Sequence, residues 1–267
     1  MAFTLTLLGT DTSFSPEATT GYDKAETLSY VSTLIDTTST GTVDNVVKFR
    51  NDKVAVINGP TTLGSEIGDR IARGVTIILE AISRGEQNIS IIAHSRGAVE
   101  AILVAHELER IQNILQESSK FKPELHASEC PYTKEALTTE PHQETFENLN
   151  WGAISSNITG VKLSMLNIDP VPGGNYIGLT YTTTLAWRDP RFYKLPKIVS
   201  EYEQYIYENE RTRCFKPIVP KCVSEETKFK LTSLPGHHGT GSGNLRDQQR
   251  RGDPSKADTS HVQELCL

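Results

Sequence analysis

The segment Ala93-His94-Ser95-Arg96-Gly97 carries the residue pattern of a serine nucleophile. It lies between an apolar, β-branched run at residues 89–93 and a stretch from 99 to 116 that contains no Gly or Pro. Small residues two positions before and two positions after a serine permit the strained strand-to-helix turn that lifts the hydroxyl above a sheet edge. The alternative is an ordinary turn whose serine caps the helix. The complete strand, turn and helix context favours Ser95 as a nucleophile.

A serine hydroxyl needs a base and an orienting acid, because it is a poor nucleophile at neutral pH. In sites built on this turn, the acid precedes the histidine in the chain. Asp169 ends the apolar run at 161–168, where the edge of a sheet would place it beside Ser95. Asp189 also precedes a proline and is the rival acid, although it lies in a charged cluster. We therefore expect Asp169 to be the acid, with a turn aspartate as the alternative.

Two adjacent histidines follow the last apolar run, residues 229–234, in a Gly-rich loop. A loop after the final strand is where the base of such a site belongs, and this favours His238. Spacing alone leaves His237 open, and a solvent-facing pair is the structural alternative. The sequence thus predicts a triad of Ser95, Asp169 and His238.

A developing oxyanion needs two backbone N–H donors. The Arg96 amide lies at the N-terminus of the expected helix, directly after the serine. The second amide should come from the loop after the first strand, and Thr10 in Gly9-Thr10-Asp11 is the candidate. Only its position supports Thr10, and a plain loop explains these residues equally well.

These side chains must be held by repeated strand-and-helix units. An amphipathic helix is expected over 67–82 and ends at Gly85, while a loop is expected from Gly9 to about residue 45. Strands are expected at 3–8, 54–57, 89–93, 161–168, 179–187, 202–207 and 229–234. Alternation of strands with helices predicts an α/β fold with a mostly parallel central sheet and helices on both faces.

The chain has 267 residues and a formal charge of −6, which disfavours a nucleic acid as partner. We expect one domain over 1–243, with a polar insertion or cap at 117–157, and a polar, loosely held tail at 244–267. No apolar run is long enough to span a bilayer, and the N-terminus lacks the pattern of a cleaved signal. The four cysteines form no C-x-x-C, no ligand spacing fits a zinc site, and no G-x-G-x-x-G is present. We therefore expect neither a metal nor an organic cofactor.

Several motifs together resemble a bacterial uncharacterised α/β-hydrolase family that includes type VI secretion phospholipase effectors. The motifs run in the family's order, with Ala93 and the segment 167–168 as departures from it. They are the elbow S-R-G-A at 95–98, the strand end N-I-D at 167–169, and P-G-x-H at 235–238 before a Gly-rich run. Weaker likenesses lie in the loop 8–11 and in the segment 207–217.

The resemblance implies an α/β-hydrolase fold in which Ser95, Asp169 and His238 act as nucleophile, acid and base. It implies a serine hydrolase acting on a carboxylic ester, with a lipid or phospholipid ester suggested and peripheral membrane contact possible. It also implies a protein that stays in the cytoplasm of its producer or is exported as an effector without a cleaved signal. An inactive binding module of the same fold and an amidase on the same triad are the alternatives.

Overall fold

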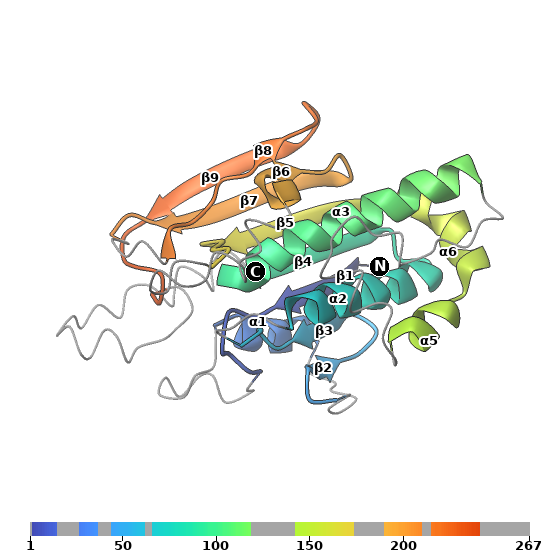
Figure 1. The fold of residues 1–267 in the computed structure, drawn as a ribbon, viewed down its shortest axis with the longest axis horizontal. Helices are drawn as coiled ribbons and strands as arrows, with labels where there is room; N and C mark the ends of the chain where they lie inside the picture. Colours follow the sequence, from blue (N-terminus) through green and yellow to red (C-terminus); the bar gives the residue numbers. More distant parts are fainter. Residues whose placement is uncertain are drawn as a thin grey trace.

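The computed structural model describes residues 2–14, 27–36, 44–61, 66–118, 142–173, 190–209 and 215–240. Within these ranges a seven-stranded sheet has the order β2-β3-β1-β4-β5-β7-β9 (Figure 1). All neighbouring strands are parallel except the antiparallel pair β2 and β3. The strands of the sheet are β1 Ala2–Leu7, β2 Val47–Arg50, β3 Val54–Ile57, β4 Asn88–His94, β5 Lys162–Ile168, β7 Val199–Tyr207 and β9 Lys228–Leu234.

Helices cover both faces of this sheet. One face carries α2 (Ile67–Ser83) and α3 (Ser95–Glu117), which lie side by side in Figure 1, and the opposite face carries α1 (Thr27–Ile35). Alternate residues of β1 separate the two cores: Phe3, Leu5 and Leu7 pack with α2 and α3, whereas Thr6 hydrogen-bonds Ser32 of α1. The fold is therefore α/β-hydrolase-like, with a mostly parallel central sheet between two helical layers.

The strand order places a topological switch point between β1 and β4. From β1 the chain runs outward to β2 and β3, then returns through α2 to β4 on the other side of β1 and continues through β5, β7 and β9. In open parallel sheets the loops diverge at such a point and leave a crevice at the carboxyl ends of the strands. Ser95 follows β4 and Thr10 follows β1, so both lie at this edge.

The remaining described elements support the same core. They are α5 (His142–Glu147), α6 (Trp151–Asn157), the 3-10 helices η3 (Ile158–Gly160) and η4 (Pro190–Tyr193), and the short strands β6 (Lys194–Leu195) and β8 (Lys221–Cys222). Phe146 and Ile154 are buried, and the Asn157 side chain donates to the carbonyl of Ile82 at the end of α2. The end of α6 therefore packs at the amino ends of the strands, whereas His142 at the start of α5 contacts Asp69 in the first turn of α2, with Nε2 at 2.6 Å from Oδ1.

Most expected elements are present, and the expected loop from Gly9 to about residue 45 is wrong over α1. This helix is rich in Ser and Thr, which are typical of loops. Its Ser32 hydroxyl donates to the Leu28 carbonyl within the helix and also meets Thr6, which explains how Ser32 is buried here. The Ser29 hydroxyl is buried as well and has no hydrogen-bond partner among the described residues. β2, of only four residues, was also not expected. The expected strand at 179–187, the rival acid Asp189 and the tail at 244–267 lie outside the described residues.

Candidate active site

Ser95 occupies the turn between β4 and α3 in a left-handed backbone conformation, with φ of 56°. L-residues rarely adopt this conformation, which costs about 1–3 kcal/mol and is concentrated at functional sites. Gly97 makes the turn possible: a Cβ atom there would lie 2.5 Å from the Leu8 carbonyl oxygen. The first turn of α3 is thereby pressed against the end of β1.

Ser95, His238 and Asp169 form a continuous hydrogen-bonded chain. Ser95 Oγ lies 2.8 Å from His238 Nε2, and the opposite ring nitrogen, Nδ1, contacts Asp169 Oδ2. All three side chains are buried or nearly so. An Nδ1–H donated to the carboxylate leaves Nε2 as an acceptor for the serine proton, so the arrangement selects one tautomer.

The backbone beyond β5 fixes Asp169. This residue is fully buried and has φ of 46°, a second left-handed conformation. Its N–H donates to the Tyr205 carbonyl at 2.7 Å, and its Oδ1 accepts from the Tyr207 N–H at 3.4 Å. The carboxylate is therefore anchored to β7 while Oδ2 faces the imidazole.

A short turn after β9 presents His238. Gly236 has φ of 121°, and the Thr240 hydroxyl accepts the His237 N–H at 3.0 Å, which closes the turn. The His238 ring is sandwiched: the Phe215 ring stacks on one side at 4.8 Å and the His94 ring stacks at 4.9 Å. His237 is directed elsewhere, since its Nδ1 accepts from the Gly239 N–H. Of the two histidines, the structure brings His238 to Ser95.

The loop after β1 is a tight turn. The Thr12 N–H donates to the Gly9 carbonyl at 3.2 Å, and Asp11 has φ of 57°. Thr10 lies between them, two residues beyond the Leu8 carbonyl that meets the elbow. The Arg96 amide lies in the first turn of α3, where helical N–H groups have no intrahelical acceptor. The structure thus keeps both expected oxyanion donors at the carboxyl edge, next to the elbow.

Left-handed backbone is concentrated at this edge. Among the described residues, Asp11, Ser95 and Asp169 are the non-glycine residues with positive φ. They follow β1, β4 and β5, which are adjacent in the sheet. Strain gathered on three neighbouring loops points to a functional site rather than to three unrelated turns.

A buried polar network beneath the triad was not expected from the sequence. Asn167 Nδ2 donates to the Ala98 carbonyl at 3.1 Å and to the Tyr202 hydroxyl at 3.2 Å, and this hydroxyl donates to Gln204 Oε1 at 2.8 Å. Gln204 Nε2 in turn donates to the Ile218 carbonyl at 2.7 Å. Residues two apart on a strand point to the same face of a sheet, so Tyr202 and Gln204 share a face that should be apolar. This pattern was the signal in the sequence that could have predicted a buried polar network.

Charged side chains surround the first turns of α2 and α3. Arg96 Nη1 donates to the Thr61 carbonyl, and Arg70 Nε donates to the Asn58 carbonyl, each at 2.9 Å. Glu100 is fully buried, and within the described residues neither of its carboxyl oxygens has a hydrogen-bond partner. Burial raises the pKa of Glu100 well above its ordinary value, and the charges of Arg70 and Arg96 oppose this effect.

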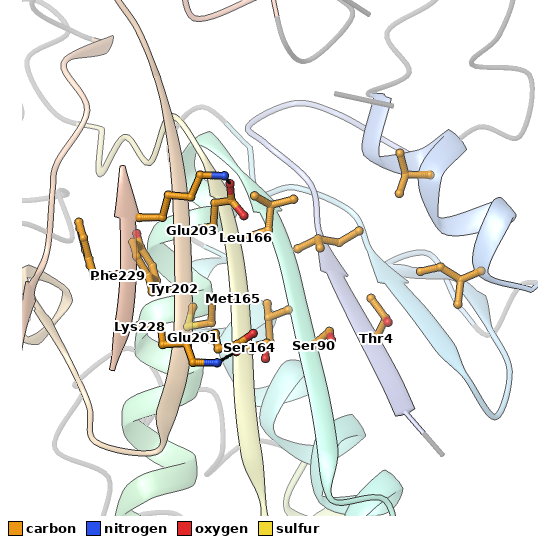
Figure 2. A pocket seen from close by; sticks show the side chains of 15 residues that line it. Thr4, Ser90, Ser164, Met165, Leu166, Glu201, Tyr202, Glu203, Lys228 and Phe229 are labelled. Carbon is orange, nitrogen blue, oxygen red and sulfur yellow. Dashed lines mark hydrogen bonds and ion pairs between the residues drawn. The ribbon is translucent and has the colours of Figure 1, made fainter. Parts of the chain in front are cut away.

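A hollow of about 520 Å³ lies on the α1 face of the sheet, and its lining residues do not include Ser95 (Figure 2). Ser90 and Ser164 line its floor, and ion pairs of Lys228 with Glu201 and of Lys230 with Glu203 cross its rim. Apolar side chains such as Ile35, Ile92 and Leu166 make up the rest of its lining. Ser95, Asp169 and His238 lie instead beyond the carboxyl ends of β4, β5 and β9.

Within the described ranges, no three His, Cys, Asp or Glu side chains gather in a group that could hold a metal ion. None of the helices in those ranges is long and apolar enough to cross a membrane.

No protein-family model and no curated protein matches the sequence. Seven solved chains are similar in structure. One is an uncharacterized protein from Pseudomonas aeruginosa, which is 12% identical, has a TM-score of 0.42 and aligns with 90% of this chain. Another is the Tle1 effector bound to the VgrG spike of a type 6 secretion system, which is 12% identical, has a TM-score of 0.37 and aligns with 91% of this chain. Thermogutta terrifontis esterase 2 is a third, which is 13% identical, has a TM-score of 0.38 and aligns with 99% of this chain. This chain spans 41%, 50% and 81% of those three chains, respectively.

Proposed function

We propose that the protein is a serine hydrolase that cleaves carboxylic esters through an acyl-enzyme intermediate. The observation that carries the proposal is the hydrogen-bonded chain from Ser95 through His238 to buried Asp169, on a strained strand-to-helix turn. A serine that only capped α3 would need neither a histidine at its hydroxyl nor a carboxylate behind that histidine.

In the proposed first step, Ser95 Oγ attacks the ester carbonyl carbon while His238 Nε2 takes the hydroxyl proton. Asp169 stabilises the imidazolium that forms, and the Arg96 and Thr10 amides bind the oxyanion. The tetrahedral intermediate collapses, the C–O bond to the alcohol breaks, and His238 returns the proton to the leaving alkoxide. Water then attacks the acyl-enzyme with His238 again as base, and the carboxylic acid and free Ser95 are released.

The substrate class is a lipid or phospholipid ester on this proposal. Support comes from the resemblance of the S-R-G-A elbow and the P-G-x-H base loop to the phospholipase-containing family. Hydrolysis by this route requires neither a metal nor an organic cofactor. Chain-length preference on model esters is the measurement that refines the class.

The test is hydrolysis of p-nitrophenyl esters from short to long acyl chains by the wild type and by Ser95→Ala, Asp169→Asn and His238→Ala. Each variant should lose at least about a hundredfold in kcat/KM, because the three side chains act as one unit. His237→Ala is the matched control, since it removes the neighbouring imidazole and leaves the Ser95 contact in place. It should keep activity within a few-fold of wild type.

Labelling of Ser95 by a fluorophosphonate probe gives a second readout that does not depend on substrate choice. A wild type that neither hydrolyses any ester nor reacts with the probe would contradict the proposal and favour a binding module of the same fold. Turnover of p-nitroanilides with no turnover of esters would replace the esterase with an amidase on the same triad.

A further inference from the structure

We propose that the Arg96 side chain is a positioning residue for the oxyanion loop, which we define as residues 9–12. The inference extends the proposed function, in which Thr10 of this loop and the Arg96 amide bind the oxyanion. One residue would then supply one donor through its backbone and fix the other through its side chain.

The Arg96 guanidinium joins loops that follow two strands on either side of the elbow. It is buried, and its Nη1 donates to the Thr61 carbonyl in the β3 loop, which we define as residues 58–61. Its Nη2 lies against Gly173 in the loop after β5, where an added Cβ would approach it to 2.4 Å. The planar guanidinium thus bonds one loop and packs against the other, a geometry that a lysine ammonium reproduces only in part.

The β3 loop in turn is fastened to the oxyanion loop. The Asp11 N–H donates to the Pro60 carbonyl at 2.9 Å, and the Gly59 N–H donates to the Thr12 carbonyl at 3.0 Å. The two backbones are in such close contact that a Cβ on Gly59 would fall 1.6 Å from the Gly9 carbonyl oxygen. Displacement of one loop must therefore displace the other.

A second buried arginine secures the far end of the β3 loop. Arg70 Nε of α2 donates to the Asn58 carbonyl, three residues before the carbonyl that Arg96 holds. Both ends of the β3 loop thus accept hydrogen bonds from arginines of the buried helices α2 and α3. The oxyanion loop, with Asp11 in an unfavourable left-handed conformation, rests on this brace.

The functional consequence follows from the geometry of oxyanion stabilisation. Donors act only within about 2.7–3.1 Å of the developing charge, and a misplacement of about 1 Å costs on the order of a hundredfold in rate. The Arg96 amide is fixed by α3, whereas the Thr10 amide depends on the brace. Loss of the Arg96 side chain should therefore lower kcat while ground-state binding is retained.

The test compares Arg96→Met, which keeps the packing of the stem but has no donor, with Arg96→Lys and with Arg110→Met as a matched control on the same helix. Arg110 lies fourteen residues beyond Arg96 on α3, about 21 Å along the helix axis, and its Nε donates to Glu107 Oε2. We expect R96M to lower kcat on p-nitrophenyl esters about 10- to 100-fold, with KM within about twofold. R96K should recover part of the loss, and R110M should keep kcat within about twofold.

Hydrogen exchange supplies a readout that does not require turnover. The Asp11 and Gly59 amides should exchange faster in R96M than in the wild type and should be unchanged in R110M. Unchanged exchange in R96M would overturn the brace, and faster exchange with wild-type kcat would overturn its role in positioning. If the wild type proves inert toward esters and the fluorophosphonate probe, the proposed function fails, and the exchange data still decide whether Arg96 holds the loop.

Discussion

Replacing Tyr202 by Phe should destabilise the protein by removing one atom from the buried network under the triad. The Tyr202 hydroxyl donates to Gln204 Oε1 and accepts from Asn167 Nδ2, and all three side chains are fully or almost fully buried. Burial raises the pKa of Tyr202, with the Asn167 hydrogen bond opposing this, so the hydroxyl remains a neutral donor throughout the usual pH range.

The loss of stability in Y202F depends on which hydrogen-bonding groups lose their partners. Asn167 Nδ2 keeps its bond to the Ala98 carbonyl, whereas Gln204 Oε1 loses the donor that the structure gives it. A buried acceptor left without a partner costs about 1–3 kcal/mol, so we expect the free energy of unfolding to fall by about 2 kcal/mol. For a chain of this size that corresponds to a decrease in Tm of about 4–8 °C.

Urea denaturation of a double-mutant cycle checks the origin of the loss. Gln204→Leu alone also removes the bond to the Ile218 carbonyl and should be destabilising. The double variant Y202F/Q204L should cost about 1–2 kcal/mol less than the sum of the two, because the orphaned acceptor is then absent. Tyr193→Phe, at an exposed tyrosine, is the control and should stay within about 0.5 kcal/mol of wild type.

The reasoning is refuted if Y202F unfolds with wild-type stability, or if the two substitutions are strictly additive. Either result would mean that the three buried groups do not act as a network. The expected results would show that the network stabilises the backbone around Ile218. The Ile218 N–H donates to the carbonyl of Pro170, the residue directly after Asp169.

Two further predictions concern α2 and the elbow. Burial alone would raise the pKa of Asp69, but hydrogen bonding and nearby arginines lower it to about 2. A carboxyl group whose pKa is lowered on folding stabilises the protein at pH values above its unfolded pKa of 3.8, and this stabilisation is lost as the pH falls through the folded pKa. Asp69→Asn should therefore lower the free energy of unfolding by about 2 kcal/mol at pH 7. In urea titrations at pH 3, the difference between the variant and the wild type should be about half as large. Gly97→Ala should cost about 3 kcal/mol and abolish probe labelling, since its Cβ would lie within 2.6 Å of the Leu7 and Leu8 carbonyl oxygens. Gly152→Ala in α6 is the control, because an added Cβ there meets nothing closer than 3.7 Å, and it should leave the Tm unchanged or raise it. Equal destabilisation of the two variants would contradict the inference that a steric clash at Gly97 causes the loss.

The elements that the sequence predicts well are those with an apolar run between turn residues. The strand Val54–Ile57 and the helix Ile67–Ser83, which is followed by Gly85 with φ of 94°, are predicted by composition and periodicity alone. The positions of Asp169 and His238 at strand ends follow from the same runs together with chain order. These patterns are local in the sequence, so they can be recognised without knowledge of the fold.

Features that depend on neighbours far apart in the chain could not be read in this way. The Arg96 bond to Thr61 joins residues 35 apart, and the Asn167 bond to Ala98 joins residues 69 apart. The helix Thr27–Ile35 was missed because its serines and threonines are typical of loops, and only packing reveals that the buried Ser32 hydroxyl bonds Leu28 within the helix and Thr6 of β1. Tertiary contacts thus decide where polar residues can be buried.

Each of the three left-handed residues at the carboxyl edge is held by a hydrogen bond to another loop or strand. The Ser95 carbonyl accepts from the Val171 N–H after β5, the Asp169 N–H donates to Tyr205 in β7, and the Asp11 N–H donates across to the β3 loop. Strain of about 1–3 kcal/mol at each position persists only where surrounding structure over-determines it. These lateral bonds provide that restraint, and they do so between neighbouring loops rather than within one. The loops at this edge therefore form one connected unit. For this reason a substitution of Arg96, whose side chain is outside the hydrogen-bonded chain of Ser95, His238 and Asp169, should lower kcat.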